Sequence, residues 1–265
     1  MFRNLKRSTE NLRHDLLALN QLADVDTRFE LKYRLTYFQY LKFRNAIKPY
    51  MNMDAYTFRH PSHRYLVRSL YFDTMDYHAY DQKMDGDNCR AKFRMRTYTK
   101  IVPDVRTVRI ELKLREGNHS IKKSVFVPME EYLHFMRYRH WDNFQNPITT
   151  EFERRLLTTN LRPMVLVEYD REGYQTKLKS NLRITFDHNL RSSHANTLFP
   201  QDAFFRKLLT RVVTLEIKFK DSRPLWLENL VRDHGLKVQA NSKFTQCIQI
   251  GRNDLHHPEN VILVR

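Results

Sequence analysis

The sequence has few of the residues that hold together small disulfide-rich, zinc-binding or membrane-spanning proteins. Only two of its 265 residues are cysteines, Cys89 and Cys247, and their spacing fits neither a disulfide framework nor a metal site. No apolar run is long enough to form a transmembrane helix, and the basic N-terminus lacks the continuous apolar core of a signal peptide. We therefore expect a soluble, cytoplasmic protein without an integral membrane segment.

Glycine is also scarce, with five residues in all, and no Gly/Ser linker or internal repeat marks a domain boundary. We expect one main domain over residues 25–252, preceded by a helical segment at 1–24 and followed by a tail at 253–265. The sequence contains no glycine-rich Walker loop and no recognisable nucleophile triad. A conventional phosphate-binding loop and a serine or cysteine nucleophile are thus not the expected basis of its chemistry.

Positive charge and aromatic residues are abundant. Lysine and arginine number 46 against 30 aspartates and glutamates, which gives a net charge of +16. The chain is nevertheless 41% hydrophobic, with 17 Phe and 14 Tyr, so it can form a core and is not a disordered polycation. Such a balance favours a polyanionic partner: nucleic acid, an anionic membrane or a polyphosphorylated molecule.

Alternation of apolar and charged residues predicts about eight strands, with helices in several of the gaps between them. The predicted strands lie at 27–35, 65–74, 89–98, 107–116, 121–128, 164–174, 182–190 and 212–220. The predicted helices lie at 9–22, 37–51, 75–84, 129–141, 149–160, 225–234 and 241–251. For the fifth of these, Thr150 and Glu153 suggest a capping box. The pattern indicates an α+β fold dominated by an antiparallel sheet.

The stretch "RAKFRMRTY", from Arg90 to Tyr98, carries a cation at every second position. Successive side chains of a strand point to opposite faces, so this strand has one apolar and one positive face. Four other predicted strands repeat the pattern with occasional carboxylates. Their charged positions are Glu30, Lys32 and Arg34; Arg109, Glu111, Lys113 and Arg115; Arg183 and Asp187; and Glu216, Lys218 and Lys220.

Two arrangements are compatible with this pattern. In a two-layer antiparallel sheet the charged face meets water. If the sheet closes instead, and amphipathic helices cover its apolar face from outside, the charged faces line a cationic lumen. Buried like charges are costly unless they are paired, so such a lumen requires glutamate partners, water, or a bound polyanion with its metal. A chain of phosphates would suit it.

Nine short motifs resemble one known family in their order and approximate spacing. They are "ELKYR", "SLYFDT", "KFRMRTY", "ELKLR", "KKS", "VEYDREGY", "LRITFD", "LEIKFK" and "NSKF", and they span about Arg28 to Ile250. Together they resemble the vacuolar transporter chaperone domain, the polyphosphate polymerase branch of the triphosphate tunnel metalloenzymes. The resemblance implies an eight-stranded antiparallel closed tunnel barrel with a charged lumen and helices packed outside.

The same resemblance implies an enzyme that moves the γ-phosphate of ATP onto a growing inorganic polyphosphate chain, assisted by a divalent metal, Mn²⁺ or Mg²⁺. The partners would then be ATP and polyphosphate, not nucleic acid, with a membrane-associated protein partner left open. A nucleic-acid binder would be expected to carry aromatic residues on its charged face, yet here they alternate away from it, apart from Tyr98.

The resemblance also implies roles for individual residues. The catalytic phosphate-binding cations would be Lys32, Arg94, Arg96, Lys113, Lys123, Arg171 and Arg183, with Lys122 as the alternative to Lys123. Further substrate contacts would come from Arg90, Lys92, Tyr98, Lys218, Ser242 and Lys243. The metal ligands would be Glu216, Glu111 and Glu30.

Several alternatives remain open at this point. The wider superfamily has a glutamate where this chain has Arg28, which removes one metal-binding carboxylate and fits the polymerase branch. A triphosphatase acting on inorganic or nucleoside triphosphates would use the same site, and a non-catalytic polyphosphate-binding module would use the same cations. Asp73 and Asp76 could bind metal, although capping the turn that follows is the simpler interpretation.

Overall fold

The computed structural model describes residues 29–116, 119–177, 181–208, 211–220 and 222–256 of the chain. The predicted helix at 9–22, Gly117 and the end of the C-terminal tail lie outside these ranges. The described residues form two compact units built from interleaved segments. The first unit contains Tyr71–Arg96 and Arg106–Pro163, and the second contains residues 29–70, Thr97–Val105 and residues 164–256.

Each of the eight predicted strands has a counterpart in the structure. These are β1 (Phe29–Thr36), β3 (Tyr65–Asp73), β4 (Cys89–Thr97), β5 (Thr107–Glu116), β6 (His119–Pro128), β7 (Arg162–Thr176), β8 (Arg183–Ser193) and β10 (Val212–Phe219). Two short strands that the sequence pattern did not predict, β2 (Met51–Met53) and β9 (Arg206–Lys207), bring the sheet to ten. Strands of two or three residues are too short to show alternation.

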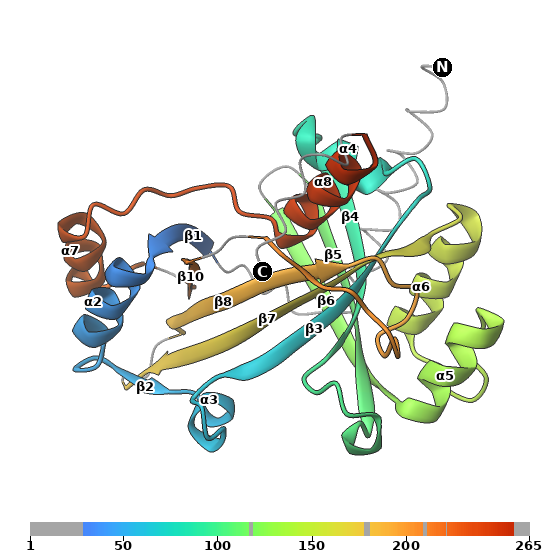
Figure 1. Ribbon diagram of the computed structural model, residues 1–265, viewed down its shortest axis with the longest axis horizontal. Helices are drawn as coiled ribbons and strands as arrows, with labels where there is room; N and C mark the ends of the chain where they lie inside the picture. The colour runs from blue at the N-terminus through green and yellow to red at the C-terminus, as the bar shows by residue number, and fades with distance from the viewer. Residues whose placement is uncertain (1–28, 117–118, 178–180, 209–210, 221, 257–265) are drawn as a thin grey trace. The chain divides into compact units, whose positions relative to one another are not determined.

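Six of the described helices follow predicted positions: α2 (Tyr37–Ile47), α4 (His78–Met84), α5 (Met129–Tyr138), α6 (Pro147–Thr158), α7 (Leu225–Asp233) and α8 (Lys243–His256) (Figure 1). The sequence pattern did not predict the short helix α3 (Ala55–Arg59) or the 3₁₀ turn η1 (Val102–Asp104). Among the described residues, no helix is long and apolar enough to cross a membrane.

The strand order is β1-β10-β8-β7-β3-β4-β5-β6, with β2 beside β7 and β9 beside β8. The strands pair in antiparallel fashion in β1–β10, β10–β8, β7–β8, β4–β5 and β5–β6, and β2 and β9 are also antiparallel to their neighbours. This confirms the α+β class and the antiparallel sheet. The order has two ends, β1 and β6, and the sheet of the described residues does not close on itself. The closed barrel is therefore not confirmed.

The local sequence explains where the helices start. Thr36 caps α2 in a capping box with Gln39, which turns the end of β1 directly into a helix. The capping box predicted for α6 is wrong, because Asn146 caps this helix instead. Glu153 accepts hydrogen bonds from the His140 ring and the Trp141 backbone N–H. Asp73 accepts the backbone N–H groups of Thr74, Ala79 and Tyr80, so it caps the segment leading into α4, as the simpler interpretation had it.

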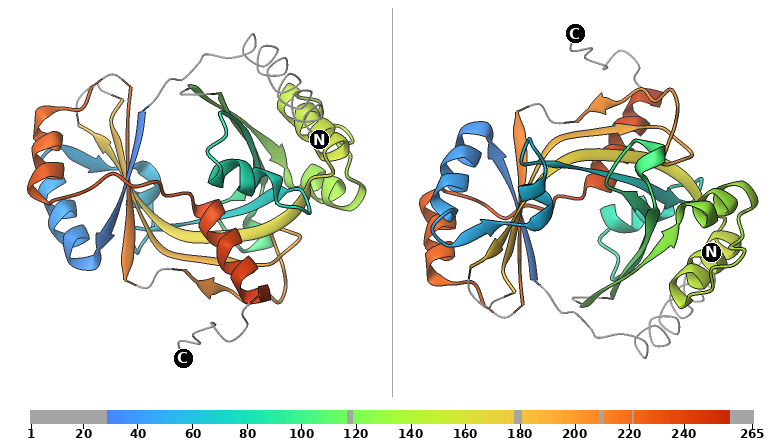
Figure 2. Two further views of the ribbon diagram at one scale, coloured as in Figure 1. Left: turned by 90° about the horizontal axis from the view of Figure 1, so that it is seen from above. Right: turned by 90° about the horizontal axis from the view of Figure 1, so that it is seen from below.

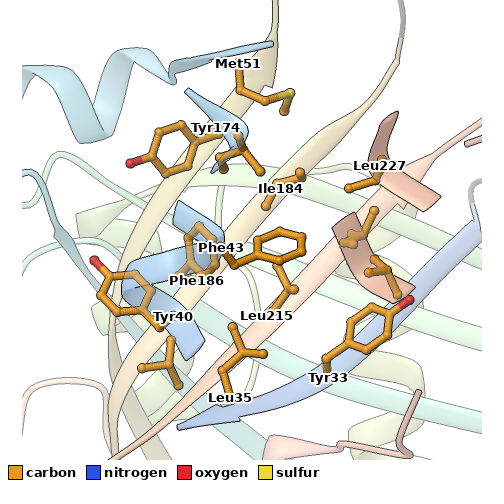
Figure 3. Packing of buried hydrophobic residues seen from close by; sticks show 14 of the residues in the cluster. Tyr33, Leu35, Tyr40, Phe43, Met51, Tyr174, Ile184, Phe186, Leu215 and Leu227 are labelled. Atoms are coloured by element: carbon orange, nitrogen blue, oxygen red, sulfur yellow. The ribbon is translucent and has the colours of Figure 1, made fainter. Parts of the chain in front are cut away.

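In the second unit, the apolar faces of β1, β10, β8 and β7 form the main core. Helices α2 and α7 lie side by side over this face (Figure 2). Figure 3 shows side chains of this core, among them Tyr33, Phe43, Phe186 and Leu215, and each of these four side chains is fully buried. The predicted covering of the apolar strand faces by amphipathic helices is thus confirmed for this unit.

Gly173 in β7 allows the start of α3 to approach the strand closely. Asp54, the N-cap of α3, donates its backbone N–H to the Gly173 carbonyl, and the Gly173 N–H is bound by Thr57. A Cβ atom at position 173 would lie 2.1 Å from Asp54 Oδ2. That oxygen also accepts a hydrogen bond from Arg183, so this contact positions a cation of the charged face.

We predict that Gly173→Ala lowers the free energy of unfolding by roughly 1–3 kcal/mol, since the added methyl group displaces the buried carboxylate of Asp54. Urea denaturation measures this. Asp54→Asn is the matched variant, because it keeps the cap and the shape but loses the charge that faces Arg183. Wild-type stability in Gly173→Ala would show that the α3 contact does not depend on the glycine.

Candidate functional site

The charged face of the second unit surrounds Glu216, a residue of β10 that is 4% exposed. The antiparallel register sets Lys32 of β1 directly opposite it. Lys243 Nζ lies 2.8 Å from one carboxylate oxygen, and Arg171 Nη2 lies 3.3 Å from the other. Lys32 and Lys218 Nζ follow at 3.6 and 3.7 Å. These five side chains are called the Glu216 cluster below.

A second carboxylate, on the neighbouring strand, binds two of the same cations, Arg171 and Lys243. Asp187 of β8 is 2% exposed. Its oxygens lie 2.6 Å from Arg171 Nε and 2.5 Å from Lys243 Nζ. Asp187, which the sequence pattern placed on the charged face, therefore pairs with two cations of that face. The Tyr169 ring completes this contact, with its centre 5.1 Å from the Arg171 guanidinium and 4.8 Å from Lys243 Nζ.

Glu216 and Lys243 favour their charged forms in spite of their burial. Loss of hydration alone would raise the pKa of Glu216, but the charges of Lys243, Lys32 and the cations beyond them hold that pKa well below its usual range. Burial likewise works against the charge of Lys243, yet Asp187 and Glu216 raise the pKa of its ammonium. The site therefore contains fixed charges of both signs that are already desolvated.

Other predicted residues of the second unit lie on neighbouring strands or at the start of α8. Glu30 of β1 lies 3.6 Å from Lys32 Nζ and 3.5 Å from Lys218 Nζ. Ser242 bonds to Thr245 at the first turn of α8. Arg183 sits opposite Lys218 in the sheet but forms its 2.8 Å ion pair with Asp54.

The first unit has a cluster of its own around Glu111 of β5, which is 1% exposed. Arg94 Nε forms the shortest ion pair with it, Lys122 Nζ lies at 2.8 Å, and Arg109 and Arg96 lie at 3.4 and 3.7 Å. Although burial opposes it, the charges of Arg94 and Arg96 hold the pKa of Glu111 far below its ordinary value. These residues are called the Glu111 cluster.

The register decides between the two lysines that the sequence left open. Lys122 is opposite Lys113, which is opposite Lys92, so all three share the face of Glu111. Lys123 is opposite Leu112, on the other face, and is buried. Lys122, and not Lys123, therefore lies on the face that carries Lys92, Arg94 and Lys113.

The remaining predicted residues divide between the two units. Arg90 is on the face of Arg94 and is buried. Tyr98 belongs to the second unit, where its ring lies 6.1 Å from that of Tyr56 and 6.2 Å from that of Tyr65. The strand "RAKFRMRTY" thus contributes to both units.

A divalent metal was expected at Glu216, Glu111 and Glu30. Within the described part of the chain no group of three or more His, Cys, Asp or Glu side chains could hold a metal by itself. Two buried oxygens near these residues have no hydrogen-bond partner. Thr185 Oγ1 belongs to the residue directly opposite Glu216 in the register, and Asn241 Oδ1 belongs to a residue whose carbonyl accepts a hydrogen bond from Lys32. These oxygens and the carboxylates of Glu216 and Glu30 are hard ligands. They fit a hard cation such as Mg²⁺, which would bring phosphate oxygens as further ligands.

Comparison with known families gives one match that covers most of the chain. The model of the VTC domain matches residues 27–251. The chain belongs to the VTC domain family. This confirms the resemblance found in the nine motifs, and both carboxylate clusters lie within the matched region of this VTC domain.

Comparison with curated proteins finds no match to this VTC domain. Solved structures similar to it include a candidate adenylate cyclase of Bacillus halodurans, with a TM-score of 0.49 and 12% identity over 82% of this chain and 94% of that one. A protein of Pyrococcus horikoshii OT3 has a TM-score of 0.45 and 12% identity over 85% and 99%. The Mimivirus capping enzyme triphosphatase has a TM-score of 0.35 and 9% identity over 85% and 96%. At these scores and identities, the similarities carry no information about activity.

Sequence reasoning missed three residues of the site. Asp54 binds Arg183, and the signal for it was an aspartate in the N-cap position before the short α3. Arg109 was placed on the charged face but not in the site, and it contacts Glu111. Tyr169 alternates with Arg171 on β7, so the period of two could have placed it beside the cations.

We predict that Glu216→Gln destabilises the VTC domain by on the order of 3 kcal/mol, because Lys243 and Arg171 lose a buried counter-ion. A bound polyanion supplies the missing negative charge. Tripolyphosphate should therefore raise the melting temperature of this variant more than that of the wild type. An equal rise in both proteins would contradict the role of Glu216 as a counter-ion.

Lys122 gives a prediction that depends on pH. Its side chain is 43% exposed, but its ammonium lies beside the Glu111 cluster. Loss of hydration and repulsion from Arg94 lower the pKa of this ammonium by more than the attraction of Glu111 raises it. The pKa of Lys122 is lowered to about 7. A bound anion raises this pKa again, so binding should take up a proton above pH 7 and little below pH 6.

Calorimetry with trimetaphosphate in buffers of different ionisation enthalpy measures this uptake, since this cyclic anion has no proton to exchange near neutral pH. Lys122→Arg is the control, because arginine stays charged and should abolish the uptake. The same uptake in both proteins would assign the proton to another group.

Proposed function

We propose that this VTC domain is a polyphosphate polymerase that transfers the γ-phosphate of ATP to the end of an inorganic polyphosphate chain. The observation that supports this most strongly is the Glu216 cluster. It is a set of three lysines and an arginine that contact a buried carboxylate on the charged face of a VTC domain. We also propose that the sheet closes into a tunnel barrel and that the protein is cytoplasmic.

The proposed reaction breaks the bond between the γ-phosphorus of ATP and the oxygen that bridges it to the β-phosphate. That oxygen keeps the electron pair and leaves as ADP. A terminal oxygen of the polyphosphate chain forms the new bond to the γ-phosphorus. This oxygen is already ionised at neutral pH, so the reaction requires no side-chain nucleophile and no general base.

The protein's part is to position the phosphates and stabilise charge on the group in transit. Arg171 suits this role because its guanidinium is held by Asp187 and its orientation is fixed before any phosphate binds. Lys32, Lys218 and Lys243 supply ammonium charges around the same carboxylate. As phosphate oxygens approach, these cations can exchange a carboxylate contact for a phosphate contact without entering water.

A divalent cation would be held by Glu216 and Glu30, with Thr185 and Asn241 nearby. It would neutralise negative charge on the phosphates. The cations of the Glu111 cluster would bind phosphate groups in the first unit.

The direct test is to incubate the purified protein with ATP and Mn²⁺ or Mg²⁺ and to separate the products on a gel stained for polyphosphate. A ladder that lengthens with time, together with ADP, supports the polymerase. Free phosphate without a ladder would replace it with a hydrolase, because the same site would then use water as the acceptor. Neither product, with retained polyphosphate binding, would leave a binding module.

We predict that Arg94→Ala reduces the rate of chain growth by about 100-fold or more, since it removes a guanidinium from the Glu111 cluster. Arg232→Ala is the matched control, because this arginine of α7 has a side chain that is 77% exposed. The initial rate of ADP formation, measured with and without added polyphosphate, compares the two. Equal rates in both variants would remove the Glu111 cluster from the proposed reaction.

A further inference from the structure

A cavity of about 470 Å³ lies in the second unit apart from the Glu216 cluster. Its walls come from β3, β7, β8 and the segments around Lys100 and residues 200–205. Its charged lining side chains are Arg68, Lys100, Arg191 and Glu168, so three cations face one carboxylate. Neither the sequence motifs nor the proposed reaction assigns a role to any of these four residues.

The cavity lies on the opposite side of β7 from the Glu216 cluster. Tyr169 and Arg171 are two residues apart on one face of β7. The Tyr169 ring contacts Lys243, and Arg171 binds the same carboxylate as Lys243, that of Asp187. Successive side chains of a strand point to opposite faces, so Glu168 and Glu172 lie on the face of β7 opposite to Tyr169 and Arg171. Glu172 accepts a hydrogen bond from Tyr40 of α2 on that face. The register between β7 and β8 shifts by one residue between Glu168 and Asp170. The extra residue lies in β8, where Asn189 has a positive φ of 53°. The alternation of side chains along β7 is therefore not interrupted.

The two arginines of the cavity are held in place before any ligand arrives. Glu168 is 3% exposed and bridges two arginines, with one oxygen bound by Arg68 Nε and the other 2.7 Å from Arg191 Nε. Arg68 is itself 6% exposed, donates to the Leu198 carbonyl at 2.9 Å and lies 5.8 Å from the Phe205 ring. A guanidinium fixed on three sides loses little side-chain entropy when it binds an anion.

Charge and chemistry define the ligand. One buried carboxylate cannot neutralise three cations, and the other acidic neighbour, Asp170, is 3.6 Å from Arg191 and partly engaged by Asn189. Lys100 is exposed, so a ligand can reach the cavity from solvent. Arginine forks match the oxygens of a tetrahedral phosphate dianion, and the volume accommodates one such group with water or a small substituent.

The geometry points to a second anion site, in which Arg68, Arg191 and Lys100 bind the phosphate dianion of inorganic phosphate or of a small phosphomonoester. This site does not depend on the proposed polymerase activity. It would, however, share β7 with the Glu216 cluster, since Glu168 is next to Tyr169, which contacts Arg171 and Lys243.

The test uses the ¹³C-labelled methyl group of Ala203, which lines the cavity, as a local reporter in NMR titrations. Orthophosphate should shift this methyl signal in a saturable way. Lys100→Glu should weaken the response by about tenfold or more, because it reverses one of the three charges. Lys42→Glu makes the same charge change on the exposed side of α2 and should leave the titration unchanged.

Parallel titrations with orthophosphate and phenyl phosphate separate the two sources of ligand. Equal affinities indicate free phosphate, and tighter binding of phenyl phosphate indicates a phosphomonoester. Crystals soaked in tungstate, a heavy tetrahedral dianion, locate the anion independently. An Ala203 signal that does not respond to either phosphate, with tungstate only at the Glu216 or Glu111 clusters, would overturn the proposal, as would full binding in Lys100→Glu.

Discussion

The structure depends on the burial of single carboxylates among several cations. Glu216 in the second unit and Glu111 in the first each contact four lysines or arginines, and both are almost fully buried. Removing such charges from water costs several kcal/mol per ion, and this cost is offset only where the pairing is close. The excess of cations over carboxylates in each cluster leaves positive charge that a polyanion can satisfy. Stability and binding therefore draw on the same side chains.

The two faces of the sheet in the second unit separate these roles. One face carries the Glu216 cluster, and the other packs against α2 and α7 in a core of aromatic and aliphatic side chains. Even on the covered face, β7 carries charged residues that are fully engaged: Glu172 accepts hydrogen bonds from Tyr40, Tyr174 and Arg44. These bonds anchor α2 to the strand that positions Arg171. The rigid side of β7 thus supports the cationic side.

Much of this arrangement could be predicted from the sequence, because alternation with a period of two fixes which residues share a face. Arg94, Glu111 and Glu216 were placed on charged faces in this way, and the register confirms it. The sequence alone could not place Lys122 or Lys123 on the charged face, since "KKS" has a lysine at two successive positions, which point to opposite faces. Only the strand pairing shows which of them lies on the face of Glu111. Asp54 and the cavity beside Glu168 also escaped prediction, because both depend on segments far apart in the sequence. Sheet closure is a property of long-range pairing that local patterns do not encode.

The central claim is that these cations are arranged for a chain of phosphates and not for polyanions in general. Binding of labelled tripolyphosphate in the presence of a large excess of single-stranded RNA tests it most directly. The arrangement of compact, desolvated charges predicts that RNA leaves the tripolyphosphate affinity almost unchanged, because bulky nucleosides separate its phosphates and obstruct close approach. Displacement of tripolyphosphate by RNA in proportion to its phosphate content would contradict the claim and make the clusters a general electrostatic surface.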